Sequence, residues 1–97
     1  MAEKSDKVAL YTFVSGRVQG VFFRMFVLRE GNRLGICGRV RNLPDGRVEV
    51  VAEGERAKLE GLLDQLRKGP RGAVVQEVTE EWAEYVHNYD DFQIDYS

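Results

Sequence analysis

A glycine-bounded segment near the start of the sequence has the composition of an anion site. It runs from Gly16 to Val21, between a predicted strand and a predicted helix. Unpaired backbone N–H groups and the positive end of the helix dipole attract phosphate at such a junction, and glycines let successive N–H groups face one concavity. Arg24 follows one helical turn later, so its guanidinium could donate two parallel hydrogen bonds to a phosphate. The predicted phosphate-binding residues are Gly16, Arg17, Val18, Gln19, Gly20, Val21 and Arg24.

This segment does not match the common nucleotide-binding loops. No Gly-Lys-Ser/Thr follows it, and the spacing G-x-G-x-x-G is absent from the sequence. Taken alone, the segment could also be a glycine-rich turn with Arg24 exposed on the following helix.

Asn42 is the second residue whose type and position suggest chemistry. It ends a predicted strand, and its carboxamide can accept a hydrogen bond from a water molecule and donate one to it. A water held in this way could attack a phosphate bound nearby. The structural alternative is a turn-initiating Asn, because Leu-Pro-Asp-Gly follows directly. Arg24 and Asn42 are therefore the candidate catalytic residues.

The charge is uneven along the chain, although the net charge is only −2. Residues 17–41 hold six arginines and one glutamate, whereas residues 42–97 hold six basic and thirteen acidic residues. The first half should attract small anions, and the acidic remainder argues against a nucleic-acid-binding protein. His87 is the only histidine, and we expect it in an exposed loop. Neither His87 nor the carboxylates near it have the spacing of metal ligands, so no metal site is predicted.

The first half of the chain shows patterns for the elements that would position these residues. Residues 8–18 alternate in hydropathy as a strand does, and the apolar positions of residues 22–34 follow helical spacing. Residues 36–41 and 47–53 are short extended segments. The Pro-Asp-Gly between them is typical of a turn, which predicts a hairpin.

The second half predicts one more helix and further strands. The helix covers residues 55–68, and its core-facing stripe has i, i+3, i+4, i+7 spacing. The stripe consists of Leu59, Leu62, Leu63 and Leu66. Residues 73–85 and the segment around residues 92–96 each predict one strand. The expected fold is α+β, a ferredoxin-like split β-α-β sandwich (β-α-β-β-α-β) with a short extra strand, an antiparallel sheet and both helices on one face.

Length and hydropathy limit the organisation and location of the protein. Ninety-seven residues fit one domain, which we expect over residues 1–97 with residues 1–7 as a disordered tail. No apolar run approaches the roughly 18–20 residues that span a bilayer, and the polar N-terminus does not look like a signal peptide. We therefore expect a cytoplasmic protein that binds no membrane and acts as a monomer.

Two longer segments resemble the signatures of a known family. Residues 14–24, Val-Ser-Gly-Arg-Val-Gln-Gly-Val-Phe-Phe-Arg, resemble the first signature of the acylphosphatase family. Residues 38–49, Gly-Arg-Val-Arg-Asn-Leu-Pro-Asp-Gly-Arg-Val-Glu, resemble the second. The resemblance covers roughly residues 8–96. Arg39 departs from it, since many members carry an aromatic residue there, but a surface position on a strand should not affect the chemistry.

The resemblance implies a metal-free hydrolase of small acyl phosphates without a cofactor. Arg24 would hold the phosphate, Asn42 would orient the attacking water, and inorganic phosphate would be both product and competitive inhibitor. The chemistry suits these residues, because the expelled carboxylate has a parent acid with a pKa of about 4 to 5 and needs no proton donor. Phosphoryl transfer then requires mainly positioning and stabilisation of negative charge.

Two functions of other classes remain open at this point. One is a non-catalytic anion sensor that uses the same loop and arginine. The other is an RNA-binding sheet, because Tyr11 and Phe13 share a strand face. The third strand argues against RNA, since it has no aromatic residue and places Glu49 where a base would stack.

Overall fold

The computed structural model describes residues 6–96, which form two helices and six strands. The strands are β1 (Lys7–Arg17), β2 (Cys37–Asn42), β3 (Val48–Glu55), β4 (Val74–Val78), β5 (Glu81–Glu84) and β6 (Phe92–Ile94). The helices are α1 (Phe23–Leu34) and α2 (Arg56–Lys68). Neither helix in this part of the chain is long and apolar enough to cross a membrane.

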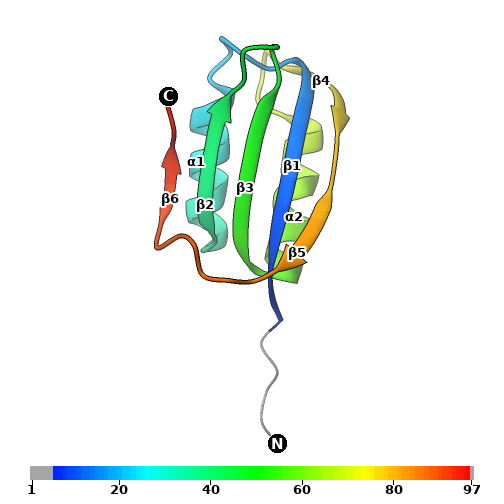
Figure 1. The fold of residues 1–97 in the computed structure, drawn as a ribbon. Helices are drawn as coiled ribbons and strands as arrows, with labels where there is room; N and C mark the ends of the chain where they lie inside the picture. Colours follow the sequence, from blue (N-terminus) through cyan, green and yellow to red (C-terminus); the bar gives the residue numbers. More distant parts are fainter. Residues whose placement is uncertain (1–5, 97) are drawn as a thin grey trace, which may run out of the picture.

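The strands form one sheet, and both helices cover the same face of it (Figure 1). The strand order is β4-β1-β3-β2-β6, and β5 also pairs with β1. The expected ferredoxin-like α+β fold is confirmed. The pairs among β1, β2, β3, β4 and β5 are antiparallel, as expected, whereas β6 pairs parallel with β2 and makes the sheet mixed.

Residues 73–85 contain two strands where the hydropathy pattern predicts one. Thr79 lies between β4 and β5, opposite Phe13 of β1. Its backbone N–H donates to the Phe13 carbonyl at 3.0 Å, but the Phe13 N–H donates to the Thr79 hydroxyl at 2.9 Å. A side chain therefore takes the place of a backbone acceptor, which interrupts the ladder between the two strands.

The N-terminal segment differs in part from the expected tail over residues 1–7. Residues 1–5 lie outside the described part of the chain. Lys7 begins β1, and the carbonyl of Asp6 accepts a hydrogen bond from the Arg56 backbone N–H at 3.1 Å. Asp6 is therefore joined to the start of α2, and Lys7 belongs to the sheet.

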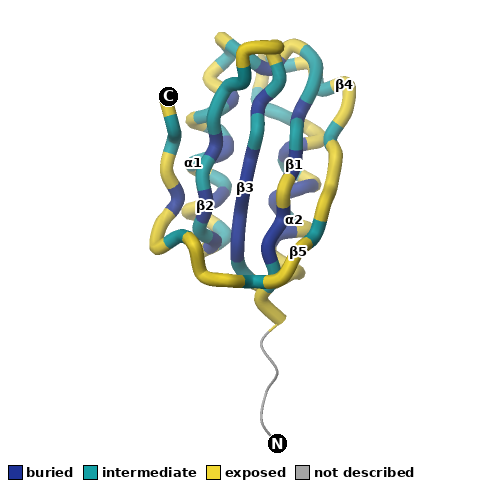
Figure 2. Tube along the Cα trace, in the orientation of Figure 1, coloured by how far each residue is buried: buried dark blue, intermediate teal, exposed yellow. Residues whose placement is uncertain are grey.

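The core lies between the sheet and the two helices, where the buried parts of both layers face each other (Figure 2). The predicted leucine stripe of α2 is confirmed, since Leu59, Leu62, Leu63 and Leu66 are at most 2% exposed. Burial of each such side chain contributes about 1.5–3 kcal/mol. On α1 the buried residues are Phe23, Val27 and Gly31, so the residues on its other faces are available to a site.

Candidate active site

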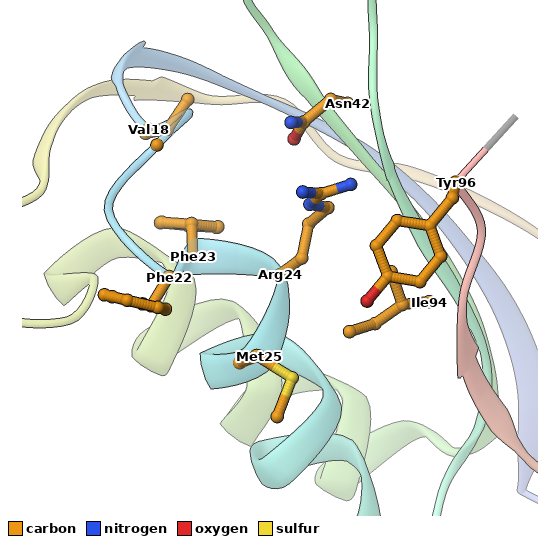
Figure 3. A pocket seen from close by; sticks show the side chains of 9 residues that line it. Val18, Phe22, Phe23, Arg24, Met25, Asn42, Ile94 and Tyr96 are labelled. Atoms are coloured by element: carbon orange, nitrogen blue, oxygen red, sulfur yellow. The ribbon is translucent and has the colours of Figure 1, made fainter.

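The β1–α1 loop and the β2–β3 hairpin lie at the same end of the sheet (Figure 1). A pocket of about 340 Å³ opens there, lined by side chains of both segments (Figure 3). The loop and α1 contribute Val18, Gly20, Phe22, Phe23, Arg24 and Met25, and the far side of the pocket consists of Asn42, Ile94 and Tyr96. The structure therefore brings together the two candidate catalytic residues, which are far apart in sequence. Of the other predicted phosphate-binding residues, Val18 and Gly20 line the pocket.

The loop begins at a bulge in β1. The register of β1 with β4 shifts between Ser15 and Gly16, and Gly16 and Arg17 pair with Val75 and Val74. Gly16 has a φ of 125°, and a Cβ there would lie 2.1 Å from the carbonyl oxygen of Val74. Only glycine fits this position. Gly16 and Arg17 are thus strand residues that direct the chain into the loop, and neither lines the pocket.

The side chains in the middle of the loop hold it in place. The Gln19 Nε2 group donates hydrogen bonds to the carbonyls of Leu43 and Arg47, both at 2.9 Å. Val18 is 1% exposed within the core, and Val21 is partly buried against the core. Gln19 therefore ties the loop to the β2–β3 hairpin, a role that the sequence did not reveal because both partner carbonyls lie more than twenty residues away.

Arg24 lies in the first turn of α1 and is half-buried. Its guanidinium points toward Asn42 (Figure 3) and lies 4.9 Å from the centroid of the Tyr96 ring. Within residues 6–96 it forms no ion pair, whereas Arg41 lies 2.6 Å from the carboxylate of Glu49. The Glu49 hydrogen bond and charge raise the pKa of Arg41 further above its usual range. The charge of Arg24, by contrast, remains available to an anion in the pocket.

Asn42 ends β2, and its side chain forms no hydrogen bond with the residues that the structure describes. Its Oδ1 atom is buried and without a partner. The following turn is closed by the Leu43 and Gly46 backbone N–H groups, which donate to Arg47 and Leu43 carbonyls at 2.8 and 3.1 Å. The Asp45 Oδ1 atom accepts from the Arg47 N–H at 3.0 Å, and this hydrogen bond lowers the pKa of Asp45. The Asn42 carboxamide is therefore not used by the turn.

Five residues of the pocket were missed by the sequence analysis: Phe22, Phe23, Met25, Ile94 and Tyr96. Ile94 and Tyr96 reach the site because β6 returns to pair with β2, and no local pattern predicts that pairing. Phe22 was predicted as the first helical residue, but it precedes α1 and adopts a left-handed backbone conformation with φ 58°.

The described residues contain no group of three or more His, Cys, Asp or Glu side chains placed to hold a metal ion. His87 has an exposed side chain, as expected, and its Nε2 atom lies 3.2 Å from Asp90 at the opposite end of the sheet from Asn42. The polar side chains that line the pocket are the Arg24 guanidinium, the Asn42 carboxamide and the Tyr96 phenol.

Known proteins are similar to this chain in both sequence and fold. The acylphosphatase family model matches residues 10–94. An acylphosphatase of Dehalococcoides mccartyi strain CBDB1 is 48% identical over 86 residues, which cover 88% of this chain and 94% of that protein. The structure of an acylphosphatase from Coxiella burnetii has a TM-score of 0.87 at 40% identity and covers 93% of this chain and 94% of its own. The crystal structure of the Bacillus subtilis acylphosphatase has a TM-score of 0.89 at 32% identity and covers 92% of this chain and 99% of its own. The chain belongs to the acylphosphatase family.

Proposed function

We propose that this protein hydrolyses small acyl phosphates to a carboxylate and inorganic phosphate. The observation that carries the proposal is that one pocket contains two polar side chains whose hydrogen-bonding groups have no protein partner in the described part of the chain. Arg24 has a guanidinium without an ion pair in residues 6–96, and Asn42 has a buried acceptor without a partner. A buried acceptor left unpaired costs about 1–3 kcal/mol, so a bound water or ligand that donates to it would be stabilised.

In the proposed site, phosphate binds between Arg24 and the backbone N–H groups of the loop from Val18 to Val21, which follows the strand residues Gly16 and Arg17. The guanidinium donates two charge-assisted hydrogen bonds to phosphate oxygens. The Gln19 side chain supports phosphate binding indirectly. Its two hydrogen bonds to the hairpin hold the loop through a side chain and do not use the backbone N–H groups of the loop. A loop held in this way is organised before the substrate arrives, which reduces the entropic cost of binding.

The proposed nucleophile is a water molecule that Asn42 orients. Its Oδ1 accepts a hydrogen bond from the water, which turns an oxygen lone pair toward phosphorus. Water attacks, the bond between phosphorus and the acyl oxygen breaks, and the bonding electron pair leaves with the carboxylate. Both protons of the water end on oxygens of the inorganic phosphate. Because the parent acid has a pKa of about 4 to 5, the leaving group needs no proton donor at neutral pH. Arg24 stabilises the negative charge on the phosphoryl oxygens during transfer.

The proposed reaction needs no metal ion, because Arg24 and the loop amides supply the positive potential. Every group in the mechanism comes from one chain, which supports action as a monomer. Inorganic phosphate occupies the same site as the substrate phosphoryl group, so it should inhibit competitively.

The test is phosphate release from acetyl phosphate at neutral pH, with and without a chelator and with added inorganic phosphate. We expect turnover that chelator leaves unchanged and that phosphate inhibits competitively. Loss of turnover in chelator, restored by a divalent ion, would contradict the metal-independent mechanism. Phosphate binding without any turnover would indicate a non-catalytic anion-binding protein instead.

A further inference from the structure

We infer that an apolar groove beside the pocket binds the acyl group of the substrate and selects acyl phosphates with extended apolar chains. We call it the acyl groove, and it is formed by Phe22, Met25, Phe26, Arg29 and Pro70. The inference rests on the proposed function, because it assigns a site to the part of the substrate that the catalytic residues do not hold.

The position and conformation of Phe22 are the first observation. Phe22 is 84% exposed, more than any other large hydrophobic residue among residues 6–96. Its backbone is left-handed, at φ 58° and ψ 28°, which is unusual for a bulky residue. Such strain costs on the order of 1–3 kcal/mol and concentrates at functional sites. Core packing offers no compensation here, because little of the ring is buried by the protein.

The groove and the catalytic pocket adjoin each other. The groove has a volume of about 340 Å³, and Phe22 and Met25 line both it and the pocket that contains Arg24 and Asn42. Met25 is also exposed, at 46%. A substrate whose phosphoryl group lies beside Arg24 can therefore extend its acyl group over two apolar side chains without leaving the protein surface.

The geometry of the reaction selects this side of the pocket. In phosphoryl transfer the attacking and leaving oxygens lie roughly in line on opposite sides of phosphorus. Figure 3 shows Asn42 on one side of the Arg24 guanidinium, and Phe22 and Met25 on the other. With water held at Asn42, the acyl group leaves toward the groove. Arg29 adds positive charge there, which favours neutral or anionic acyl groups over cationic ones.

The first experiment needs no variant. It compares kcat/KM for acetyl, butanoyl and hexanoyl phosphate, whose carboxylate leaving groups have closely similar basicity. Complete burial of one methylene corresponds to about a fourfold gain, and partial burial in an open groove reduces it. We expect kcat/KM to rise at least roughly tenfold from acetyl to hexanoyl phosphate. A flat or falling series would overturn the inference.

The second experiment tests the residue that forms the groove. Phe22→Ala should lower the ratio of kcat/KM for hexanoyl over acetyl phosphate at least roughly fivefold, and Phe22→Leu should retain most of it. Phe22→Gly removes the ring and also relieves the backbone strain, because glycine adopts the left-handed conformation readily. It should lower the hexanoyl-to-acetyl ratio as much as Phe22→Ala does, which would show that the loss of the ring, and not the strain, causes the change. The control is Val86→Ala, since Val86 is 59% exposed and lines neither the groove nor the pocket. This variant should keep the wild-type ratio.

The outcomes separate the two proposals. Equal losses for both substrates in the Phe22 variants would mean that Phe22 positions the loop, which overturns its role as an acyl contact. Hydrolysis of all substrates at equal rates by the wild-type protein would overturn the acyl groove and leave the proposed function intact. No hydrolysis of any acyl phosphate would contradict the proposed function itself.

Discussion

Asn42→Ala separates catalysis from folding more sharply than any other substitution at this site. The Asn42 side chain forms no hydrogen bond within residues 6–96, and its Oδ1 is a buried acceptor without a partner. Alanine therefore removes no interaction that stabilises the fold. We expect the free energy of unfolding to change by less than about 1 kcal/mol.

The effect on the reaction should be large. Without the carboxamide, the attacking water loses the group that orients it, and misplacement of a reactant by about 1 Å can cost on the order of 10²-fold in rate. A loss of this size in kcat corresponds to about 2.7 kcal/mol of activation free energy. The inhibition constant of inorganic phosphate should change by less than about threefold, since Arg24 and the loop amides remain in place.

The assay is steady-state hydrolysis of acetyl phosphate, combined with phosphate inhibition and urea unfolding of the same preparations. Asn32→Ala is the matched control, because Asn32 is exposed on α1 and does not line the pocket. Asn42→Asp keeps an acceptor but adds negative charge beside the phosphate, so it should weaken phosphate inhibition more than alanine does. A near-normal kcat for Asn42→Ala would refute the proposed role, and the water would then require another orienting group, such as a phosphate oxygen.

Three further predictions concern the anion site, the core and the single thiol. Arg24→Ala should raise the phosphate inhibition constant at least roughly tenfold and lower kcat/KM, because it removes a charged donor used in binding and in the transition state; unchanged inhibition would place the anion elsewhere. Leu62→Ala should lower the free energy of unfolding by about 2–5 kcal/mol in urea titrations, because Leu62 is fully buried; a change below about 0.5 kcal/mol would contradict its place in the core. Burial raises the pKa of Cys37, and Asp91 and Asp90 add to the effect. The Cys37 thiol should therefore react with iodoacetamide at a midpoint pH above that of the urea-unfolded chain, and equal midpoints would contradict the raised pKa. Its contribution to stability is present below the pKa of the unfolded chain and should be lost as pH rises through the pKa of the folded protein.

Local patterns in the sequence were sufficient for the parts of the fold that depend on near neighbours. The stripe from Leu59 to Leu66 predicts a helix and its buried face, because residues three and four apart share one side of a helix. The Pro-Asp-Gly segment predicts the turn between β2 and β3 for a similar reason, since its backbone preferences are intrinsic. The position of Arg24 one turn after the glycine loop is also a local property, and it was sufficient to suggest an anion site.

The pairing of distant segments was not predictable in this way. The break between β4 and β5 depends on a hydroxyl of Thr79 that meets Phe13, and the sequence separation between them is 66 residues. The parallel pairing of β6 with β2 brings Ile94 and Tyr96 to the pocket. Neither the break in the strand nor the parallel pairing leaves a periodic hydropathy pattern in the sequence. Each depends on which backbone and side-chain groups remain unpaired once the central strands have formed.

The sequence by itself determined the residue types of the site, the two motifs that carry them and the elements on which they lie. Only the tertiary structure decided that the Asn42 carboxamide is free of the turn, that Gln19 anchors the loop and that Phe22 is exposed beside Arg24. The physical reason is that residue type and local spacing specify what a side chain can do and which face of an element it occupies. Whether its hydrogen bonds are used, and what it contacts, depends on the packing and register of segments that are distant in the chain.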